Sequence, residues 1–182
     1  MKIYSFPLLI IALLTVFTSC DNTTQQTTLP EEVSEPDDIS DDSLFTLVQE
    51  RTFQYFWDGA EPNSGMARER YHVDGVYPQD DRHIVAVGGS GFGVMAIIVG
   101  MERNFISFDE GVQRLQRIVN FLENADRFHG VWPHWINGET GEVKPFSPRD
   151  DGGDLVETAF MAQGLIAARQ FLRQHKETEL AD

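Results

Sequence analysis

The segment from Gly91 to Arg103 places the strongest constraint on the fold, because its apolar residues lie on nearly every side of a helix. They are Phe92, Val94, Met95, Ile97, Ile98, Val99 and Met101. A helix that is hydrophobic all round has to be buried on most sides. A second segment, from about Asp154 to His175, begins with residues of the same kind. We therefore expect two inner helices.

Two amphipathic segments alternate with the buried ones. The first runs from about Ser43 to Trp57, with Ser43 as its predicted cap. The other starts at Ser107, where Ser107 and Glu110 have the spacing of a capping box. Each segment carries a single apolar stripe, which predicts an outer helix with one exposed face.

The connections between these helices alternate between long and short. Residues 58–88 and 125–153 form loops of 31 and 29 residues, whereas residues 104–107 form a short turn. Loops of such length are usually functional. The order of outer helix, long loop, inner helix and short turn, given twice, predicts an all-α fold of the α/α toroid type, with the long loops on the active-site side. Two helical hairpins cannot close a ring, so we expect residues 44–182 to be the N-terminal part of a toroid domain.

Residues 1–20 have the pattern of an export signal. Lys2 precedes an apolar run, 3–17, that is shorter than the roughly 20 residues of a membrane span. The run ends near Cys20, the single cysteine, and Phe17-Thr18-Ser19-Cys20 resembles the lipobox of bacterial lipoproteins, with Phe17 in place of the commoner leucine. We expect a lipid on Cys20 and a place on the bacterial cell envelope. The alternatives are an ordinary secretory signal and an uncleaved anchor.

Acidic residues dominate the rest of the chain. Residues 21–43 contain eight acids, two prolines and no base, which predicts a disordered tether. Residues 44–182 contain 21 acids and 13 bases, and the whole chain has a formal charge of −15. This charge disfavours nucleic acid, whose phosphates require Lys and Arg. We expect a neutral ligand instead.

Four acids lie within eight positions where the second inner helix begins. Asp154 suits the N-cap, and its spacing to Glu157 imitates a capping box. Capping does not account for Asp150 and Asp151. Crowded carboxyl groups tend to share a proton, and a glycosidase needs one protonated carboxyl as its general acid. A calcium site is the weaker alternative because the spacing differs from that of an EF-hand, and we expect neither a metal nor another cofactor.

The loop before this acidic motif is rich in aromatic residues. Trp132 and Trp135 flank His134, and indole rings can stack on sugars while their N–H groups bind hydroxyls. The alternative is that the tryptophans only fix the loop to the body. We expect substrate contacts from these three residues, from Asp151 and from Arg68 of the other long loop. The charged residues around Arg68 have the further alternative of pairing with one another at the surface.

Three segments in this order resemble the N-terminal part of the glucoamylase-like proteins of glycoside hydrolase family 144. They are TFQYFWDGAEPNSGMARER (52–70), VAVGGSGFGVMAIIVGMERNFIS (85–107), and HGVWPHWINGETG with FSPRDDGGDLVETAFMAQGL within 129–165. The resemblance implies an incomplete (α/α)6 toroid, of which this chain supplies about two of the six hairpins. It also implies cleavage of β-1,2-glucan or a related β-glucan, endo-acting and with inversion. The functional acids that it implies are Asp150, Asp154 and Glu157.

The spacing of these acids complicates a simple pairing. An inverting glycosidase holds its two carboxyl groups roughly 6.5–9.5 Å apart, whereas Asp154 and Glu157 share one helical face. We expect one of them to be catalytic and the other to orient it or to bind a hydroxyl. Two other classes of function stay open: a tethered, non-catalytic glucan-binding module or inactive remnant, and a polysaccharide lyase. The acidic loop disfavours the lyase, since uronate substrates need cationic partners.

Overall fold

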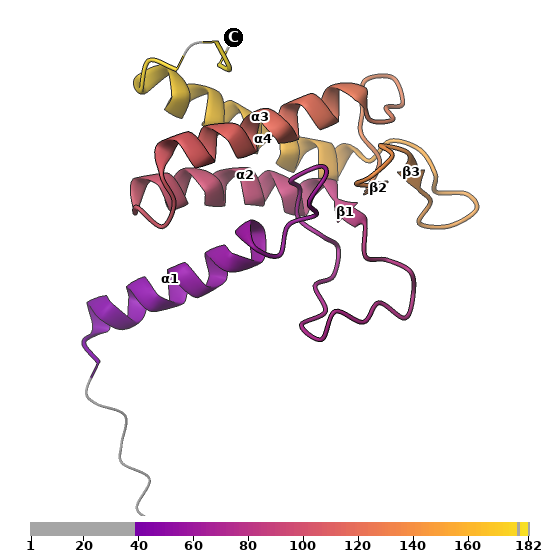
Figure 1. Cartoon of the computed structure of the whole chain (residues 1–182). Helices are drawn as coiled ribbons and strands as arrows, with labels where there is room; N and C mark the ends of the chain where they lie inside the picture. Colours follow the sequence, from indigo (N-terminus) through magenta and orange to yellow (C-terminus); the bar gives the residue numbers. More distant parts are fainter. Residues whose placement is uncertain (1–38, 178, 182) are drawn as a thin grey trace, which may run out of the picture. The chain divides into compact units, whose positions relative to one another are not determined.

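The computed structural model describes residues 39–177 and 179–181 (Figure 1). The predicted signal segment, Cys20 and most of the predicted tether lie outside these residues. The elements along the described part are α1 (Asp41–Trp57), β1 (Ile84–Ala86), α2 (Val87–Glu102), α3 (Phe108–Asn124), β2 (Trp135–Asn137), β3 (Val143–Lys144) and α4 (Leu155–Gln174). The predicted order of four helices is confirmed.

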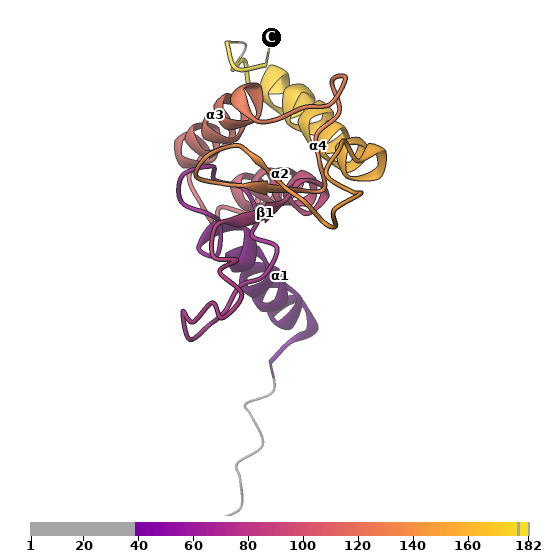
Figure 2. The same ribbon diagram turned by 90° about the vertical axis from the view of Figure 1, so that its right-hand side faces the viewer.

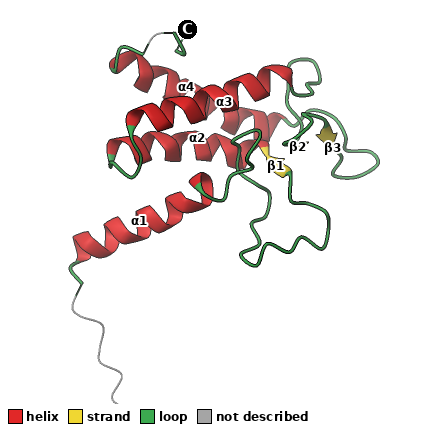
Figure 3. Ribbon diagram, viewed as in Figure 1, coloured by secondary structure: helices red, strands yellow, loops and turns green. Residues whose placement is uncertain are grey.

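The helices alternate in direction, so both inner helices begin at the same end. In Figure 1, α1 and α3 run one way, and α2 and α4 run the other way. Figure 3 shows the strands and both long loops gathered at the end where α2 and α4 start. The predicted order, with a long loop before each inner helix, is therefore confirmed, and it places both loops at the N-termini of α2 and α4.

Helix α2 is the central element. In Figure 2 it lies between α1 on one side and α3 and α4 on the other, and it packs against all three. Its closest neighbour is α4: a Cβ added at Gly91 would overlap the carbonyl of Phe160, and one added at Gly164 would overlap the carbonyl of Gly91. Among the described residues, neither this apolar helix nor any other has both the length and the hydropathy to cross a membrane.

Two predicted helix starts are wrong. Helix α1 begins at Asp41, because Ser40 rather than Ser43 is the N-cap and accepts a hydrogen bond from the Ser43 amide. Helix α2 begins at Val87, four residues before the predicted Gly91. Glycines such as Gly88 and Gly91 suggest a loop in the sequence, but they are helical here. Without side chains, they leave room for the Glu157 carboxylate and for the Phe160 carbonyl of α4.

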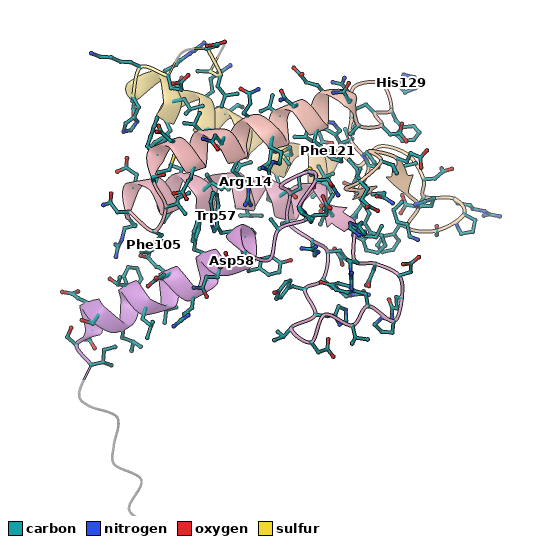
Figure 4. The ribbon with its side chains drawn as sticks, in the orientation of Figure 1. Trp57, Asp58, Phe105, Arg114, Phe121 and His129 are labelled. Atoms are coloured by element: carbon teal, nitrogen blue, oxygen red, sulfur yellow. The ribbon has the colours of Figure 1, made fainter. Side chains whose placement is uncertain are left out.

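Helix α3 has the capping box that its sequence predicts. The Ser107 hydroxyl accepts a hydrogen bond from the Glu110 amide, and the Glu110 carboxylate accepts one from the Ser107 amide. Arg114 extends from α3 toward the end of α1, where its guanidinium lies 4.1 Å from the centre of the Trp57 ring (Figure 4). It also donates a hydrogen bond of 3.2 Å to the Trp57 carbonyl, so α3 is tied directly to α1.

A small antiparallel sheet joins the two long loops. Strand β1 follows the first loop and pairs with β2 of the second loop, with Ile84 opposite Asn137. Strand β2 then pairs with β3 across a turn at residues 137–141, in which the Gly141 amide donates to the Asn137 carbonyl. The strands have three, three and two residues, which is too short for an alternating pattern to predict them.

A buried carboxylate organises the first loop. Glu61 has no exposed surface and accepts hydrogen bonds from the Ser64 amide and hydroxyl at 2.7 and 2.8 Å, and from the Asn63 amide at 3.0 Å. Its other oxygen lies 3.1 Å from His83 Nδ1. Burial by itself would raise the pKa of Glu61, but the hydrogen bonds from Ser64, His83 and Asn63 together lower that pKa below its ordinary value. The folded loop therefore favours the charged form of Glu61.

The lowered pKa of Glu61 predicts a specific sensitivity to acid. An unfolded glutamate has a pKa of about 4.3. The stabilisation is therefore present above that value, and it is lost as the pH falls through the lower pKa of the folded state. We expect Glu61→Gln to lower the free energy of unfolding at pH 7 by about 1–3 kcal/mol. We also expect it to weaken the loss of stability below about pH 4.3.

Urea unfolding at a series of pH values measures both effects of Glu61→Gln. The matched control is Glu123→Gln, which alters an exposed carboxylate on α3. The control should behave like the unaltered protein at every pH. An acid dependence of Glu61→Gln as steep as that of the unaltered protein would show that Glu61 does not have this role.

Candidate active site

One loop segment is bonded to the first turns of both inner helices. The Val87 amide of α2 donates to the His134 carbonyl at 3.0 Å, and the Asp154 amide donates to the Trp132 carbonyl at 2.8 Å. The Trp132 amide in turn donates to the Thr158 hydroxyl of α4 at 3.0 Å. Residues 132–134 thus hold the N-termini of α2 and α4 at a fixed separation.

Asp154 is the N-cap of α4, as its sequence position predicts. Its Oδ1 accepts hydrogen bonds from the amides of Val156 at 2.9 Å and Glu157 at 3.0 Å. Its Oδ2 lies 3.4 Å from His134 Nδ1. Because capping uses only one carboxylate oxygen, the other faces the imidazole of the aromatic loop.

Glu157 does not complete the capping box that the spacing suggests, so this prediction is wrong. Its Oε2 instead accepts a hydrogen bond of 2.8 Å from the Gly88 amide in the first turn of α2. The N-cap of α2 is Ala86, which has no side-chain acceptor, and the first amides of a helix need partners from elsewhere. A Cβ at position 88 would lie 2.7 Å from Glu157 Oε2. Glycine at this position therefore permits the contact.

The two acids consequently keep one oxygen each for other partners. Glu157 Oε1 and Asp154 Oδ2 accept no hydrogen bond from a backbone amide within residues 39–177 and 179–181. Helix N-termini favour negative charge through their dipoles and unpaired amides. The carboxylate of Asp154 thus lies at the N-terminus of α4, and that of Glu157 reaches the N-terminus of α2.

Aromatic side chains form a cluster beside Asp154. The rings of Trp135 and Phe146 stack with centres 4.7 Å apart, and His134 lies 5.2 Å from Trp135 and 5.3 Å from Phe146. The Trp135 indole N–H donates to Glu69 Oε2 at 2.9 Å, which joins this cluster to the first long loop. Phe146 is 53% exposed. Such a surface can stack against the apolar face of a sugar ring.

Two members of this neighbourhood are not identified from the sequence as parts of the site. Phe146 comes from the connection after β3, and Glu69 comes from the first loop, 66 residues before Trp135. The available signal for Phe146 is its place directly before the acidic motif. Glu69 is one of the charged residues around Arg68, but no local pattern places it beside Trp135, because only the pairing of β1 with β2 brings the loops together.

Trp132 and Arg68 have structural contacts in this chain. Trp132 packs against the core, and its indole N–H donates to the Leu122 carbonyl at 3.3 Å. Arg68 donates from Nε to the Arg82 carbonyl at 2.8 Å and from Nη1 to the Gly59 carbonyl at 2.7 Å. Both residues fix loops in place, and their predicted contacts with substrate stay predictions.

Asp150 and Asp151 lie on the exposed connection between β3 and α4. Asp150 closes a turn through its backbone, donating to the Ser147 carbonyl at 3.0 Å and accepting from the Phe146 amide at 2.9 Å. The side chains of both acids are exposed. The structure therefore brings Asp154, Glu157 and His134 together and leaves Asp150 and Asp151 on a separate turn. Their predicted roles in catalysis and substrate binding stay predictions.

A metal site is not evident in the part of the chain that the structure describes. No group of three or more His, Cys, Asp or Glu side chains is placed there to hold an ion. The acids of this site are positioned by backbone amides and by His134.

Comparison with known proteins gives a close match to glucan hydrolases. No family model matches the chain. Over 142 residues, it is 51% identical to an exo β-1,2-glucooligosaccharide sophorohydrolase (non-reducing end) of Parabacteroides distasonis. This match covers 78% of the chain and 19% of that relative.

Solved structures show the same likeness. An endo-β-1,2-glucanase from Chitinophaga pinensis, in complex with sophorotriose and glucose, is 63% identical with a TM-score of 0.76. The match covers 79% of this chain and 35% of that one. A β-1,2-glucanase from Parabacteroides distasonis is 49% identical with a TM-score of 0.71, over 79% of this chain and 20% of the glucanase.

These matches confirm the resemblance to glucoamylase-like glucanases over about four fifths of the chain. They also confirm the fold class, because the solved neighbours are glucoamylase-like α/α toroids. The chain spans about a fifth of the length of the curated relative and about a third of the Chitinophaga pinensis structure.

The contact between Glu157 and Gly88 predicts different effects for two substitutions. Glu157→Gln keeps an amide oxygen that can accept the Gly88 hydrogen bond, so its stability should stay close to that of the unaltered protein. Glu157→Ala leaves the amide unpaired, and we expect a loss of about 1 kcal/mol in the free energy of unfolding. Urea denaturation measures the difference. Equal stability of the two variants would show that Glu157 does not cap α2.

Proposed function

We propose that this chain is, or forms part of, a glycoside hydrolase that cleaves β-1,2-glucan or a related β-glucan. The observation that carries the proposal is the 63% identity to an endo-β-1,2-glucanase solved with sophorotriose and glucose. Two carboxylates beside an exposed aromatic cluster supply the groups that such a reaction needs.

The proposed mechanism divides the work between the acids and the aromatic cluster. The exposed ring of Phe146 stacks on a glucose ring, and Trp135, which packs against Phe146, helps to orient the chain of the substrate. The reaction is inverting: one carboxyl group protonates the glycosidic oxygen while another activates a water molecule on the opposite face of the ring. Of Asp154 and Glu157, one is a proposed reacting group and the other orients it or binds a hydroxyl, while Asp150 is the third proposed acid, on the neighbouring turn.

The setting of this activity is also part of the proposal. The pattern of residues 1–20 and the position of Cys20 support a lipid anchor on the bacterial cell envelope. The acidic surface supports a neutral glucan as substrate, since a polyanion would be repelled. The anchored protein would meet its substrate outside the cytoplasm.

Asp154→Asn separates catalysis from capping. Asparagine is as good an N-cap as aspartate, so the variant should keep the stability of the unaltered protein. A missing acid or base costs about 10²–10⁴-fold in rate, and we expect the release of reducing ends from β-1,2-glucan to fall by that factor. The assay uses the protein produced from its own gene, so that the whole product is tested.

Asp109→Asn is the matched control for Asp154→Asn. Asp109 is an exposed acid in the first turn of α3, and its substitution should leave the rate unchanged. Full activity of Asp154→Asn would remove Asp154 from the reacting groups. The absence of any hydrolysis by the unaltered protein would contradict the proposed function itself.

A tethered glucan-binding module is the second candidate function. Its support is that Asp154 and Glu157 both cap helices here. This candidate predicts oligosaccharide binding without product release, and binding that Asp154→Asn does not weaken. Calorimetric titration with sophorotriose, together with analysis of products, separates it from the hydrolase.

A further inference from the structure

A groove on the outer side of α3 is lined by side-chain amides. It has a volume of about 590 Å³ and lies between α3, the β2–β3 turn and the first long loop. Its carboxamide residues are Asn63, Gln113, Gln116, Asn120 and Asn124. Four of them follow one another along one face of α3, at spacings of three or four residues. None of Asp150, Asp154 and Glu157 lines this groove, so it is separate from the candidate active site.

Contacts within the helix hold several of these amides in place. Gln116 Nε2 donates to Asn120 Oδ1 at 2.8 Å, and Asn124 Nδ2 donates to the Asn120 carbonyl at 2.8 Å. These bonds leave Gln116 Oε1 and Asn124 Oδ1 as acceptors and Asn120 Nδ2 as a donor. Donors and acceptors therefore lie side by side along the groove. Sugar hydroxyls both donate and accept hydrogen bonds, so they can pair with such a row better than a ligand that offers only donors or only acceptors.

Phe121 adds an apolar surface among these amides. It lines the groove, is partly buried against the core, and lies toward the end of α3 that is near the long loops (Figure 4). A pyranose ring presents hydroxyls at its edge and C–H groups on its face. An aromatic ring among carboxamides is complementary to both.

The charges of the groove argue against other ligands. Arg117 is the basic residue in its lining, Glu139 is the acidic one, and Arg117 already donates to the Pro62 carbonyl at 3.2 Å. A phosphate-bearing ligand would lack the cluster of cations that it needs. An apolar peptide would leave the carboxamides without partners, which costs free energy.

We propose that this groove is a second binding site, separate from the candidate active site, for a neutral oligosaccharide. The polar and aromatic groups of the groove suit such a ligand whether or not the chain hydrolyses glucan. A site of this kind keeps a long glucan chain on the protein between encounters with the candidate active site.

Nuclear magnetic resonance with sophorotriose as the probe tests the site directly. The full chain carries Asp154→Asn so that the trisaccharide is not consumed, and the side-chain NH₂ signals of the carboxamides are followed during titration. We expect the signals of Gln113, Gln116, Asn120 and Asn124 to move together and to saturate. In a variant with Gln113→Ala and Asn120→Ala, the affinity measured at the remaining groove amides should fall about tenfold or more.

Gln170→Ala is the matched control, because Gln170 is an exposed glutamine on α4 outside the groove. It should leave the affinity unchanged. Groove signals that do not move, or equal affinity in the double variant, would overturn the proposal. If the double variant does not fold, Gln113→Ala alone is judged by the same criterion.

A second assay separates failure of the proposed binding site from failure of the proposed hydrolase activity. Hydrolysis of β-1,2-glucan by the protein with an unaltered Asp154 is assayed separately. Binding in the groove without any hydrolysis would support the second site and contradict the hydrolase. Hydrolysis with unmoved groove signals would support the hydrolase and overturn the second site.

Discussion

The hydrogen bond from the Gly88 amide to the Glu157 carboxylate is the interaction on which the candidate site depends. Helices α2 and α4 start at the same end of the fold, and the first amides of each need acceptors. Asp154 serves α4, but Ala86 provides no side-chain acceptor for α2. Glu157 meets this need from the neighbouring helix. The requirement to cap two adjacent helices therefore fixes one oxygen of each carboxylate, and a site for acid and base chemistry can be built on those positions.

Local sequence patterns predict most of the helical fold. Hydrophobic periodicity and cap residues identify all four helices, and Ser107 and Asp154 cap α3 and α4 as expected. The start of α2 is not predictable in this way, because glycines near its N-terminus favour a loop when taken alone. They are helical because Gly88 contacts Glu157 and Gly91 contacts α4, each about 70 residues further along the chain.

The sequence predicts which residue types form the site, but it does not predict which way their side chains point. Trp132 and Trp135 lie in the same aromatic loop, yet one packs on the core while the other stacks on Phe146. The difference arises because the pairing of β2 with β1 turns Trp135 toward the first loop, where Glu69 accepts its N–H. Glu157 likewise turns toward α2 instead of back along its own helix. Contacts between distant segments, which no local pattern contains, decide these directions.

Hydrogen exchange at the Gly88 amide tests most directly whether Glu157 joins the two inner helices. In the unaltered protein, this amide should exchange much more slowly than an exposed loop amide such as that of Val73, because it is bonded to the carboxylate. Glu157→Ala should remove most of that protection while the Val87 amide, which is bonded to the His134 carbonyl, keeps its own. Exchange of Gly88 that is already as fast as that of Val73 in the unaltered protein would contradict the account.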